Sequence, residues 1–390
     1  MKQIKVLHLS TSGMLLDTFI APSLGIFDRN EYTFEFACSK YSPTSINYID
    51  NLQEAGFKVH IFDFSYNINL FSDLYYILKL IIFLRKNRFD IIHTHSSKGG
   101  VIGRISGFFA RCPIIFHTVH SFYFHDEDLP FIKKIFFKYI ETVLSMITTK
   151  VFFVSYQLID EALTLNIVRQ NKIQYIGPYL QSLKTEFSQI INLDSNFQFY
   201  PIPHNKLIIG SISRLVRSKR IDIFIKIAAE LVTRNSDLHF IIIGDGPEYP
   251  ILYDLVCDLK LDNCFTFTKS LSKKDTLALL QKFDIFFLPT SREGFGVVFA
   301  EAMASKVPII GPNIRPISDF VVDTECGYLC NNDLKAYLEK IQYLINNPLK
   351  RKEMGLKGFE IIWNLLNEDN NSHLIYDTYQ YEIFNRARFN

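Results

Sequence analysis

Short apolar runs alternate with longer amphipathic segments along most of the chain, and this alternation limits the fold more than any other feature. In the first half, the runs that predict strands are Ile4–Leu9, Phe34–Cys38, Val59–Phe62, Ile91–His95, Ile114–Thr118 and Val151–Val154. The segments Leu70–Lys86 and Phe131–Ile147 predict helices between these strands. Strands that alternate with helices predict a parallel sheet covered by helices on both faces.

The same order starts again in the second half of the chain. The second set of strands is predicted at Leu207–Ile212, Leu238–Ile243, Cys264–Thr268, Ile285–Leu288, Pro308–Ile310 and Gly327–Leu329. Between the two sets, the polar segment Ser188–Asn205 contains two prolines and indicates a linker. The length of 390 residues is sufficient for two cores. We therefore predict two doubly wound α/β domains, residues 1–190 and 206–364, followed by a helical segment at 365–390.

The composition indicates a globular chain with a small net charge. Hydrophobic residues make up 48% of the chain and charged residues 21%, which excludes a disordered chain. The formal net charge of +2 argues against nucleic acid as a partner, because a nucleic-acid interface needs a concentration of cations.

The cysteines and the apolar segments indicate the compartment. Six cysteines are scattered without a C-x-x-C pair, which favours reduced thiols in the cytoplasm. Cys326 and Cys330 as metal ligands are the alternative, but they lack a second pair. The apolar core of Met1–Ser10 is too brief to predict a signal peptide. Leu74–Leu84, interrupted by Lys79, is too short to predict a membrane span.

The segment Thr290–Ala304 carries the densest functional signal. It follows the apolar run Phe283–Leu288 and places Glu293 and Glu301 on either side of a Gly-Phe-Gly turn. The pattern predicts a strand, a tight loop and a helix whose free N–H groups face that loop. Two carboxylates beside a helix N-terminus suit a ligand with several hydroxyls and phosphate, such as a nucleotide sugar. The alternative is a pair of carboxylates that only complement the helix dipole.

A second signal follows the strand Leu207–Ile212. Arg214 and Lys219 flank a short turn before the predicted helix Asp222–Val232, and fixed cations at a strand end suit a diphosphate. The alternative is an exposed basic loop. The later turn Gly244–Pro247 is interpreted as structural, because the chain lacks the G-x-G-x-x-G pattern of dinucleotide sites there.

The E-x7-E pattern of Glu293 and Glu301, with the upstream R-L-x-x-x-K pattern of Arg214 and Lys219, resembles the donor site of retaining glycosyltransferases of family 4. The resemblance implies the GT-B fold, in which two Rossmann-like domains face each other across a cleft. It also implies that the last helix crosses back to the N-terminal domain, which binds the acceptor. Where relatives often carry glycine after the lysine, this chain has Arg220, either as a further phosphate contact or as an exposed side chain.

The resemblance assigns the donor-binding roles as follows. Glu301 is expected to bind the ribose hydroxyls and Glu293 the hydroxyls of the donor sugar, while Arg214 and Lys219 bind the diphosphate. Further donor contacts are expected from Gly13, Lys269, Leu271, Phe295, Gly296 and Val297. Lys269 and Leu271 border the base, and the N–H groups of residues 295–297 face the sugar and phosphates.

The N-terminal half carries a second resemblance to the same family. His93-Thr94-His95 is similar to an H-x-H segment of relatives, with half of a metal site as the alternative for its histidines. His120 matches the histidine beside the donor sugar, although Ser121 replaces the usual glycine after it; the alternative is a packed core histidine. Gly13 stands where relatives often have two glycines. We expect His120, Glu293, Arg214 and Lys219 to be the catalytic residues.

The resemblance implies transfer of a sugar from a nucleotide-diphosphate donor with retention of configuration and without a metal or other cofactor. A UDP-sugar is the expected donor, and a GDP-mannose-dependent mannosyltransferase is an alternative. The expected acceptor is a hydroxyl of a glycan or of a polyprenyl-diphosphate-linked glycan in capsule or lipopolysaccharide synthesis. The acidic run Asp126-Glu127-Asp128 resembles the metal motif of another glycosyltransferase fold, but we interpret it as a solvated turn.

Other functions remain open at this point. A nucleotide-sugar 2-epimerase shares the architecture. A nicotinamide-dependent oxidoreductase would also use doubly wound domains, but this chain lacks the glycine fingerprint of such enzymes. A non-catalytic glycan-assembly protein would not need the donor residues. The helix Phe131–Ile147 mixes lysines with phenylalanines, so it either packs on its own sheet or contacts a membrane surface. We expect a cytoplasmic protein that is peripheral on the inner face of the plasma membrane.

Overall fold

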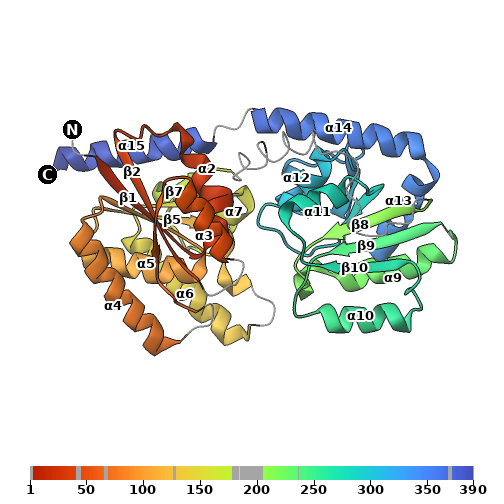
Figure 1. The fold of residues 1–390 in the computed structure, drawn as a ribbon, viewed down its shortest axis with the longest axis horizontal. Coiled ribbons are helices and arrows are strands. Elements are labelled where there is room, and N and C mark those ends of the chain that lie inside the picture. Colours follow the sequence, from red (N-terminus) through yellow and green to blue (C-terminus); the bar gives the residue numbers. More distant parts are fainter. Residues whose placement is uncertain are drawn as a thin grey trace. The chain divides into compact units, whose positions relative to one another are not determined.

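The computed structural model describes residues 3–40, 45–65, 69–125, 129–177, 184, 205–235, 237–367 and 371–389. The chain divides into two compact units (Figure 1). Unit 1 contains Met1–Ser182 and Asp369–Asn390, and unit 2 contains Leu183–Glu368. Each unit is a parallel sheet covered by helices, so the predicted fold class of two Rossmann-like α/β domains is confirmed.

The sheet of unit 1 has the strand order β3-β2-β1-β4-β5-β6-β7. Its strands are β1 Ile4–Ser12, β2 Tyr32–Ser39, β3 Lys58–Ile61, β4 Ile91–His95, β5 Ile114–Val119, β6 Lys150–Phe153 and β7 Ile173–Tyr175. All neighbouring strands pair in parallel. The edge strand β7 was not predicted, because it has three half-buried residues and no distinct apolar run.

Unit 1 has helices on both faces of this sheet. They are α1 Gly13–Leu15, α2 Ala21–Ser23, α3 Ser45–Glu54, α4 Leu70–Asn87, α5 Ser97–Ala110, α6 Phe131–Ile147, α7 Tyr156–Thr164 and α15 Asn371–Phe389. Successive residues of β1 point to opposite faces, so Val6 belongs to a core that includes Tyr379 of α15, and Leu7 belongs to a core that includes Leu80 of α4. The C-terminal helix is therefore part of unit 1.

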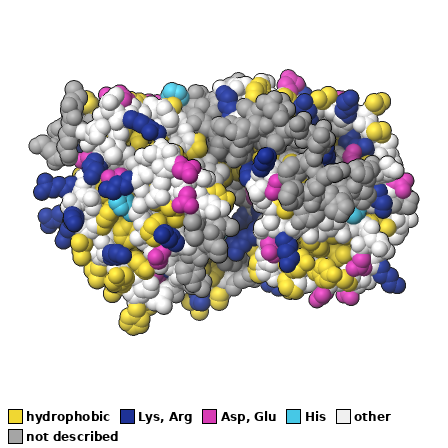
Figure 2. Space-filling view, in the orientation of Figure 1, with side chains coloured by type: hydrophobic (Ala, Val, Ile, Leu, Met, Phe, Trp, Pro, Cys, Tyr) yellow, Lys and Arg dark blue, Asp and Glu magenta, His cyan; other side chains and the backbone are white. Residues whose placement is uncertain are grey.

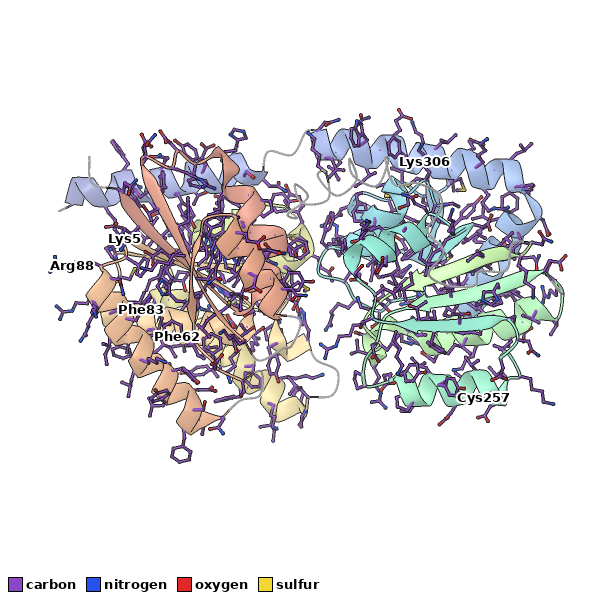
Figure 3. The ribbon with its side chains drawn as sticks, in the orientation of Figure 1. Lys5, Phe62, Phe83, Arg88, Cys257 and Lys306 are labelled. Atoms are coloured by element: carbon purple, nitrogen blue, oxygen red, sulfur yellow. The ribbon has the colours of Figure 1, made fainter. Side chains whose placement is uncertain are left out.

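Helix α4 shows how local signals fix an element and how packing places it. The Asn69 side chain accepts a hydrogen bond from Ser72 N at 3.1 Å and caps the helix, and Arg88 ends it in a left-handed conformation. Phe83 of α4 packs edge-on against Phe62, which follows β3, with 5.5 Å between the ring centroids (Figure 3). This contact holds one face of α4 against the sheet.

The sheet of unit 2 has the order β10-β9-β8-β11-β12-β13. Its strands are β8 Leu207–Ile212, β9 Leu238–Ile243, β10 Phe265–Lys269, β11 Ile285–Phe287, β12 Ile309–Pro312 and β13 Gly327–Cys330. Its described helices are α9 Ile221–Val232, α10 Tyr249–Asp258, α11 Lys273–Leu280, α12 Val297–Ala304, α13 Leu334–Asn346 and α14 Pro348–Asn367.

Each sheet has one point at which the strand order reverses. In unit 1 this point lies between β1 and β4, and in unit 2 it lies between β8 and β11. In open parallel sheets, ligands bind beyond the carboxyl ends of the strands at such a switch point. The loops after β8 and β11 carry Lys219 and Glu293, which places the predicted donor residues beside the switch point of unit 2.

Among the described residues, no helix combines the length and apolarity that a bilayer crossing needs.

Candidate active site

Two loops of unit 2 are joined at the carboxyl end of the sheet. Ser218 O accepts a hydrogen bond from Ser291 N at 2.7 Å and another from the Thr290 hydroxyl at 3.1 Å. Thr290 is fully buried, and its hydroxyl lies 2.8 Å from Arg292 O. The loop after β8 is therefore fixed against the loop after β11.

This junction brings together two of the predicted catalytic residues. Nζ of Lys219 lies 2.6 Å from Oε1 of Glu293, and both side chains are largely buried. A charge-assisted hydrogen bond of this length fixes both groups at the switch point. The pair can hold a carboxylate toward sugar hydroxyls and an ammonium toward phosphate oxygens, which are the roles predicted for these residues.

Arg220 departs from the family pattern after the lysine, and its backbone conformation shows what the position requires. Its backbone has φ 53° and ψ 39°, in the left-handed region that glycine adopts without cost. Its Nε lies 3.6 Å from Asp222 Oδ1, an ion pair at the surface. A glycine would fit this backbone without cost, and arginine occupies the conformation with some strain.

The Gly244–Pro247 turn supports the loop that carries Arg214. Leu215 N donates to Asp245 O at 3.0 Å, and Glu248 N donates to Leu215 O at 3.1 Å. At Gly244, φ is 139° and a Cβ atom would lie 1.9 Å from Ser213 O. The turn therefore requires glycine for close backbone approach, which agrees with the structural role that we predicted.

Glu301 lies in the second turn of α12 and is only 3% exposed. Its Oε1 forms a short ion pair with the ammonium of Lys273 at the start of α11. Lys273 was missed by the sequence reasoning, since nothing in the local pattern connects it with a residue 28 positions later. The structure therefore gives both predicted carboxylates a lysine partner.

The loop between Glu293 and Glu301 ends in a left-handed glycine. Gly296 has φ 87° and is the residue before α12. The ring of Phe295 stacks on Phe320 with 4.8 Å between centroids, so this side chain anchors the loop. None of the described residues accepts a backbone hydrogen bond from the N–H groups of Phe295, Gly296 or Val297. These donors and the positive end of the helix dipole can bind an anion.

The remaining predicted donor residues lie near the same edge of the sheet. The Arg214 side chain is exposed just after β8. Lys269 ends β10 with φ 58°, and its ammonium lies 5.0 Å from the centroid of the Tyr249 ring. Leu271 is half-buried in the loop that leads to α11.

In unit 1, a cluster of buried histidines lies at the centre of the sheet. Nδ1 of His8 lies 3.0 Å from Nε2 of His95, and the two rings are stacked. His93 is hydrogen-bonded through Nδ1 to the Tyr379 hydroxyl and through Nε2 to the Thr118 hydroxyl, each at 2.7 Å. His8, His93 and His95 have one ring nitrogen each within 4.8 Å of one another. Both nitrogens of His93 are hydrogen-bonded to protein groups. These bonds favour a packed hydrogen-bond network over the alternative of a metal site for this histidine.

His120 follows β5, and its ring lies 5.9 Å from that of His95 between centroids. The residue is half-buried, but its Nε2 atom is buried, and desolvation lowers the pKa of His120 to about 4. Burial likewise lowers the pKa of His8 to about 3 and holds the pKa values of His93 and His95 well below their usual range. These imidazoles are therefore neutral at physiological pH.

The glycines within α5 allow it to approach the sheet. A Cβ atom on Gly100 would lie 2.5 Å from the His117 ring. Ser96, with φ 62°, lies just after β4, and its hydroxyl is 3.0 Å from that of Thr11, so it joins this loop to the end of β1. Gly13 is buried at the start of the short helix α1, directly after β1.

Two alternatives from the sequence concern metals. Cys326 and Cys330 are buried free thiols, and burial raises the pKa of each to about 11, which disfavours the thiolate that a metal needs. The acidic run Asp126-Glu127-Asp128 lies outside the described residues, so its interpretation as a solvated turn stays a prediction.

Comparison with known proteins identifies the class. Residues 28–178 match the model of the family "Glycosyltransferase Family 4", and residues 193–360 match that of "Glycosyl transferases group 1". The two matches lie one in each half of the chain. The chain thus contains a domain of each of these two families, and it is a glycosyltransferase with the GT-B combination of two Rossmann-like units.

Particular relatives narrow the comparison. The chain is 28% identical to the capsular polysaccharide biosynthesis glycosyltransferase CapM of Staphylococcus aureus, over 81% of this chain and 85% of the relative. It is 25% identical to the UDP-Gal:alpha-D-GlcNAc-diphosphoundecaprenol alpha-1,3-galactosyltransferase of Escherichia coli, over 92% and 94%. The fold is similar to that of Anabaena HepE in complex with UDP and glucose, with a TM-score of 0.76 and 17% identity over 97% of this chain and 100% of that one.

Proposed function

We propose that the protein transfers a sugar from a UDP-sugar, with retention of configuration, to a hydroxyl of a glycan or lipid-linked glycan in cell-surface polysaccharide synthesis. The observation that carries the proposal is the convergence of Lys219 and Glu293 at the switch point of unit 2. It provides a fixed cation and a fixed carboxylate where a parallel sheet binds its ligand.

The donor is proposed to bind to unit 2 through its diphosphate and its hydroxyls. Arg214 and Lys219 supply positive charge, and the N-terminus of α12 supplies N–H donors for phosphate oxygens. Glu293 accepts hydrogen bonds from the donor sugar, and Glu301 accepts them from the ribose. Lys273 holds the Glu301 carboxylate in place for this role. Lys269 and Leu271 are proposed to border the base.

The reaction follows from the charge that develops on the leaving group. The bond between the anomeric carbon and the diphosphate oxygen breaks, and the acceptor oxygen forms a bond on the same face of an oxocarbenium-like centre. The acceptor proton passes to the departing diphosphate. Arg214 and Lys219 stabilise the negative charge of that group, so this proposal requires no metal and no general acid.

His120 is assigned an orienting role in this proposal. Because its pKa is lowered to about 4, it acts as a neutral imidazole that donates or accepts a hydrogen bond, and it is not the nucleophile. The N-terminal domain is proposed to bind the acceptor, and Gly13 is proposed to contribute to donor binding.

The relatives support the choice of substrates. The name of the relative from Escherichia coli specifies a UDP-galactose donor and a diphosphoundecaprenol-linked acceptor, and that of CapM specifies capsular polysaccharide. Both relatives align with most of this chain. We therefore propose a UDP-sugar and a polyprenyl-diphosphate-linked glycan, used by a cytoplasmic enzyme that works at a membrane surface.

Nucleotide binding tests the donor site directly. The thermal unfolding temperature is measured with UDP, GDP, ADP and NAD in the presence of a chelator. We expect stabilisation by UDP that is lost in Glu301→Ala and Arg214→Ala and retained in Glu230→Ala, an exposed carboxylate on α9. Stabilisation by NAD alone, or by none of the nucleotides, would contradict the proposal, and a requirement for divalent cation would contradict metal independence.

The stereochemical outcome tests the second part. With a UDP-sugar donor and a synthetic lipid-linked acceptor, nuclear magnetic resonance of the product reports the anomeric configuration. We expect the configuration of the donor. Inversion would overturn the proposed mechanism and leave donor binding intact.

A further inference from the structure

Helices α4, α5 and α6 form one layer on unit 1, and ion pairs hold the layer together. Asp73 of α4 pairs with Lys98 of α5 at 2.7 Å, and Arg104 of α5 pairs with Glu141 of α6 at 2.8 Å. All four side chains are largely buried. Helix α5 contacts both neighbours, so the three helices expose their outward faces together.

The outward face of this layer is apolar. Its exposed large hydrophobic side chains are Leu70, Phe71, Leu74, Tyr75, Leu78 and Ile82 on α4, Phe108 and Phe109 on α5, and Phe131, Ile132, Ile135, Phe136, Tyr139, Val143 and Met146 on α6. On α4 the positions 70, 74, 78 and 82 form a stripe with helical spacing. Hydrophobic side chains gather at this part of the surface in Figure 2, over the region that Figure 1 labels α4. Exposed apolar patches of this extent mark sites of interaction.

The charge that the described residues of α4 and α6 contribute to this face is mostly positive. The acidic residues of α4 and α6 are Asp73 and Glu141, and both are neutralised by the pairs with α5. The remaining charged residues of these two helices are cations: Lys79, Arg85, Lys86, Lys133, Lys134 and Lys138. Arg88 ends α4, and Arg85 donates to Phe109 O at 2.8 Å, next to the exposed aromatic pair of α5. The face therefore combines aromatic and aliphatic side chains with lysine and arginine.

We infer that the outward face of α4, α5 and α6 is a docking surface for an anionic lipid bilayer. Apolar side chains on a basic helix face enter the boundary between headgroups and acyl chains, and the cations bind anionic headgroups. A second copy of the chain is a poorer occupant, because a two-fold contact places the same cations opposite each other. The inference rests on the proposed function for its purpose, since a lipid-linked acceptor is held at a membrane.

Binding of the full chain to vesicles tests this surface. Sedimentation is compared for vesicles of phosphatidylcholine alone and for vesicles in which phosphatidylglycerol replaces a third of the lipid. We expect binding to the anionic vesicles only, weakened by added salt. Phe71→Asp and Ile132→Asp are suitable variants, because the native side chains are 90% and 79% exposed and contribute little to the core. Each is expected to weaken binding at least about tenfold.

Matched controls separate this surface from the rest of the chain. Leu349→Asp changes a residue that is 85% exposed on α14 of unit 2, and it is expected to leave vesicle binding unchanged. Lys79→Gln and Lys133→Gln are each expected to weaken binding about fivefold. Lys335→Gln, at an exposed position of α13, is expected to leave vesicle binding unchanged.

Three outcomes would overturn the inference. They are no binding of the parent chain to either kind of vesicle, binding by the α4 and α6 variants that equals binding by the parent chain, and a dimer that Ile132→Asp dissociates. The last outcome, measured by analytical ultracentrifugation, would assign the face to a second copy. Hydrolysis of a UDP-sugar in solution, without vesicles, is expected to be unchanged in all these variants. If the parent chain binds anionic vesicles but hydrolyses no UDP-sugar, the proposed function is refuted and the docking surface still stands.

Discussion

Nζ of Lys219 lies 2.6 Å from Oε1 of Glu293, although 74 positions separate the two residues along the chain. The contact exists because β8 and β11 are neighbours at the reversal of strand order, and because Ser218 O binds the loop after β11. The chemistry of the candidate site depends on this junction, and the following predictions test it and the parts that support it.

Replacement of Glu293 by alanine should reduce turnover roughly hundredfold or more, since it removes a charged group proposed to strengthen its contacts in the transition state. The matched control is Glu230→Ala in the same unit, which should retain parental turnover. The measurement is the rate of UDP release from the donor in the presence of acceptor. Near-parental turnover in Glu293→Ala would remove this carboxylate from the catalytic set.

Replacement of Lys273 by methionine should destabilise unit 2 and weaken UDP binding. The Glu301 carboxylate is buried, so loss of its cation costs about 1–3 kcal/mol, at the lower end because the Lys273 side chain is 41% exposed. Lys273→Arg should retain most of both properties. In the double variant Glu301→Gln, Lys273→Met, stability should recover in part, because no charge is left buried. Calorimetric unfolding with and without UDP gives both quantities, and additive losses would rule out the coupling.

Replacement of Gly244 by alanine should destabilise unit 2 by more than about 1 kcal/mol, because the backbone has φ 139° and the new Cβ would overlap Ser213 O. It should also raise the KM for the donor, because the displaced loop carries Arg214. Gly25→Ala is the control, since a Cβ there meets no atom within 4 Å. Equal effects of the two substitutions on urea unfolding would argue against the close contact.

Replacement of Arg220 by glycine should stabilise the protein by about 1 kcal/mol, because it removes a side chain from the left-handed region. The exposed ion pair with Asp222 offsets little of this gain. Donor affinity should stay within about twofold. Arg217→Gly, in the short 3-10 helix that precedes Arg220, should instead lower stability. A large loss of affinity in Arg220→Gly would assign the guanidinium to the phosphates.

The buried histidines should make unit 1 sensitive to acid. In the folded state the pKa values of His8 and His120 are lowered to about 3 and about 4, whereas in the unfolded state they lie near 6.5. Between these limits the unfolded state binds more protons, so stability is full above pH 6.5 and falls as the pH decreases. Each histidine that stays neutral contributes about 1.4 kcal/mol per pH unit in this window.

Hydrogen exchange measured by mass spectrometry can localise that effect. After correction for intrinsic rates, peptides from β4 and β5 should lose protection between pH 7 and pH 5. Peptides from β8, β11 and β12 should change less, because among the described histidines of unit 2 only His239 has a lowered pKa. Uniform loss across both units would assign the acid sensitivity to other groups.

Much of the fold could be predicted from local patterns. The bounds of β4, β8 and β9 and of helix α6 agree with the prediction, because each is a distinct run with strand or helix periodicity. The short strand β7 was missed, since three half-buried residues give no period. Glu293, Glu301, Arg214 and Lys219 were found from their spacing in the chain, and their roles remain proposals.

By itself, the sequence determined the alternation of strands and helices, the division into two domains and the positions of the donor motifs, because these depend on residues close together in the chain. Only the tertiary structure decided that Lys273 pairs with Glu301, that Tyr379 of the last helix binds His93, and that Asp73 and Glu141 turn inward and leave α4 and α6 with cations outside. These relationships join residues far apart in the chain. They arise from strand order and from which face of each helix packs against its neighbours, which no local pattern specifies.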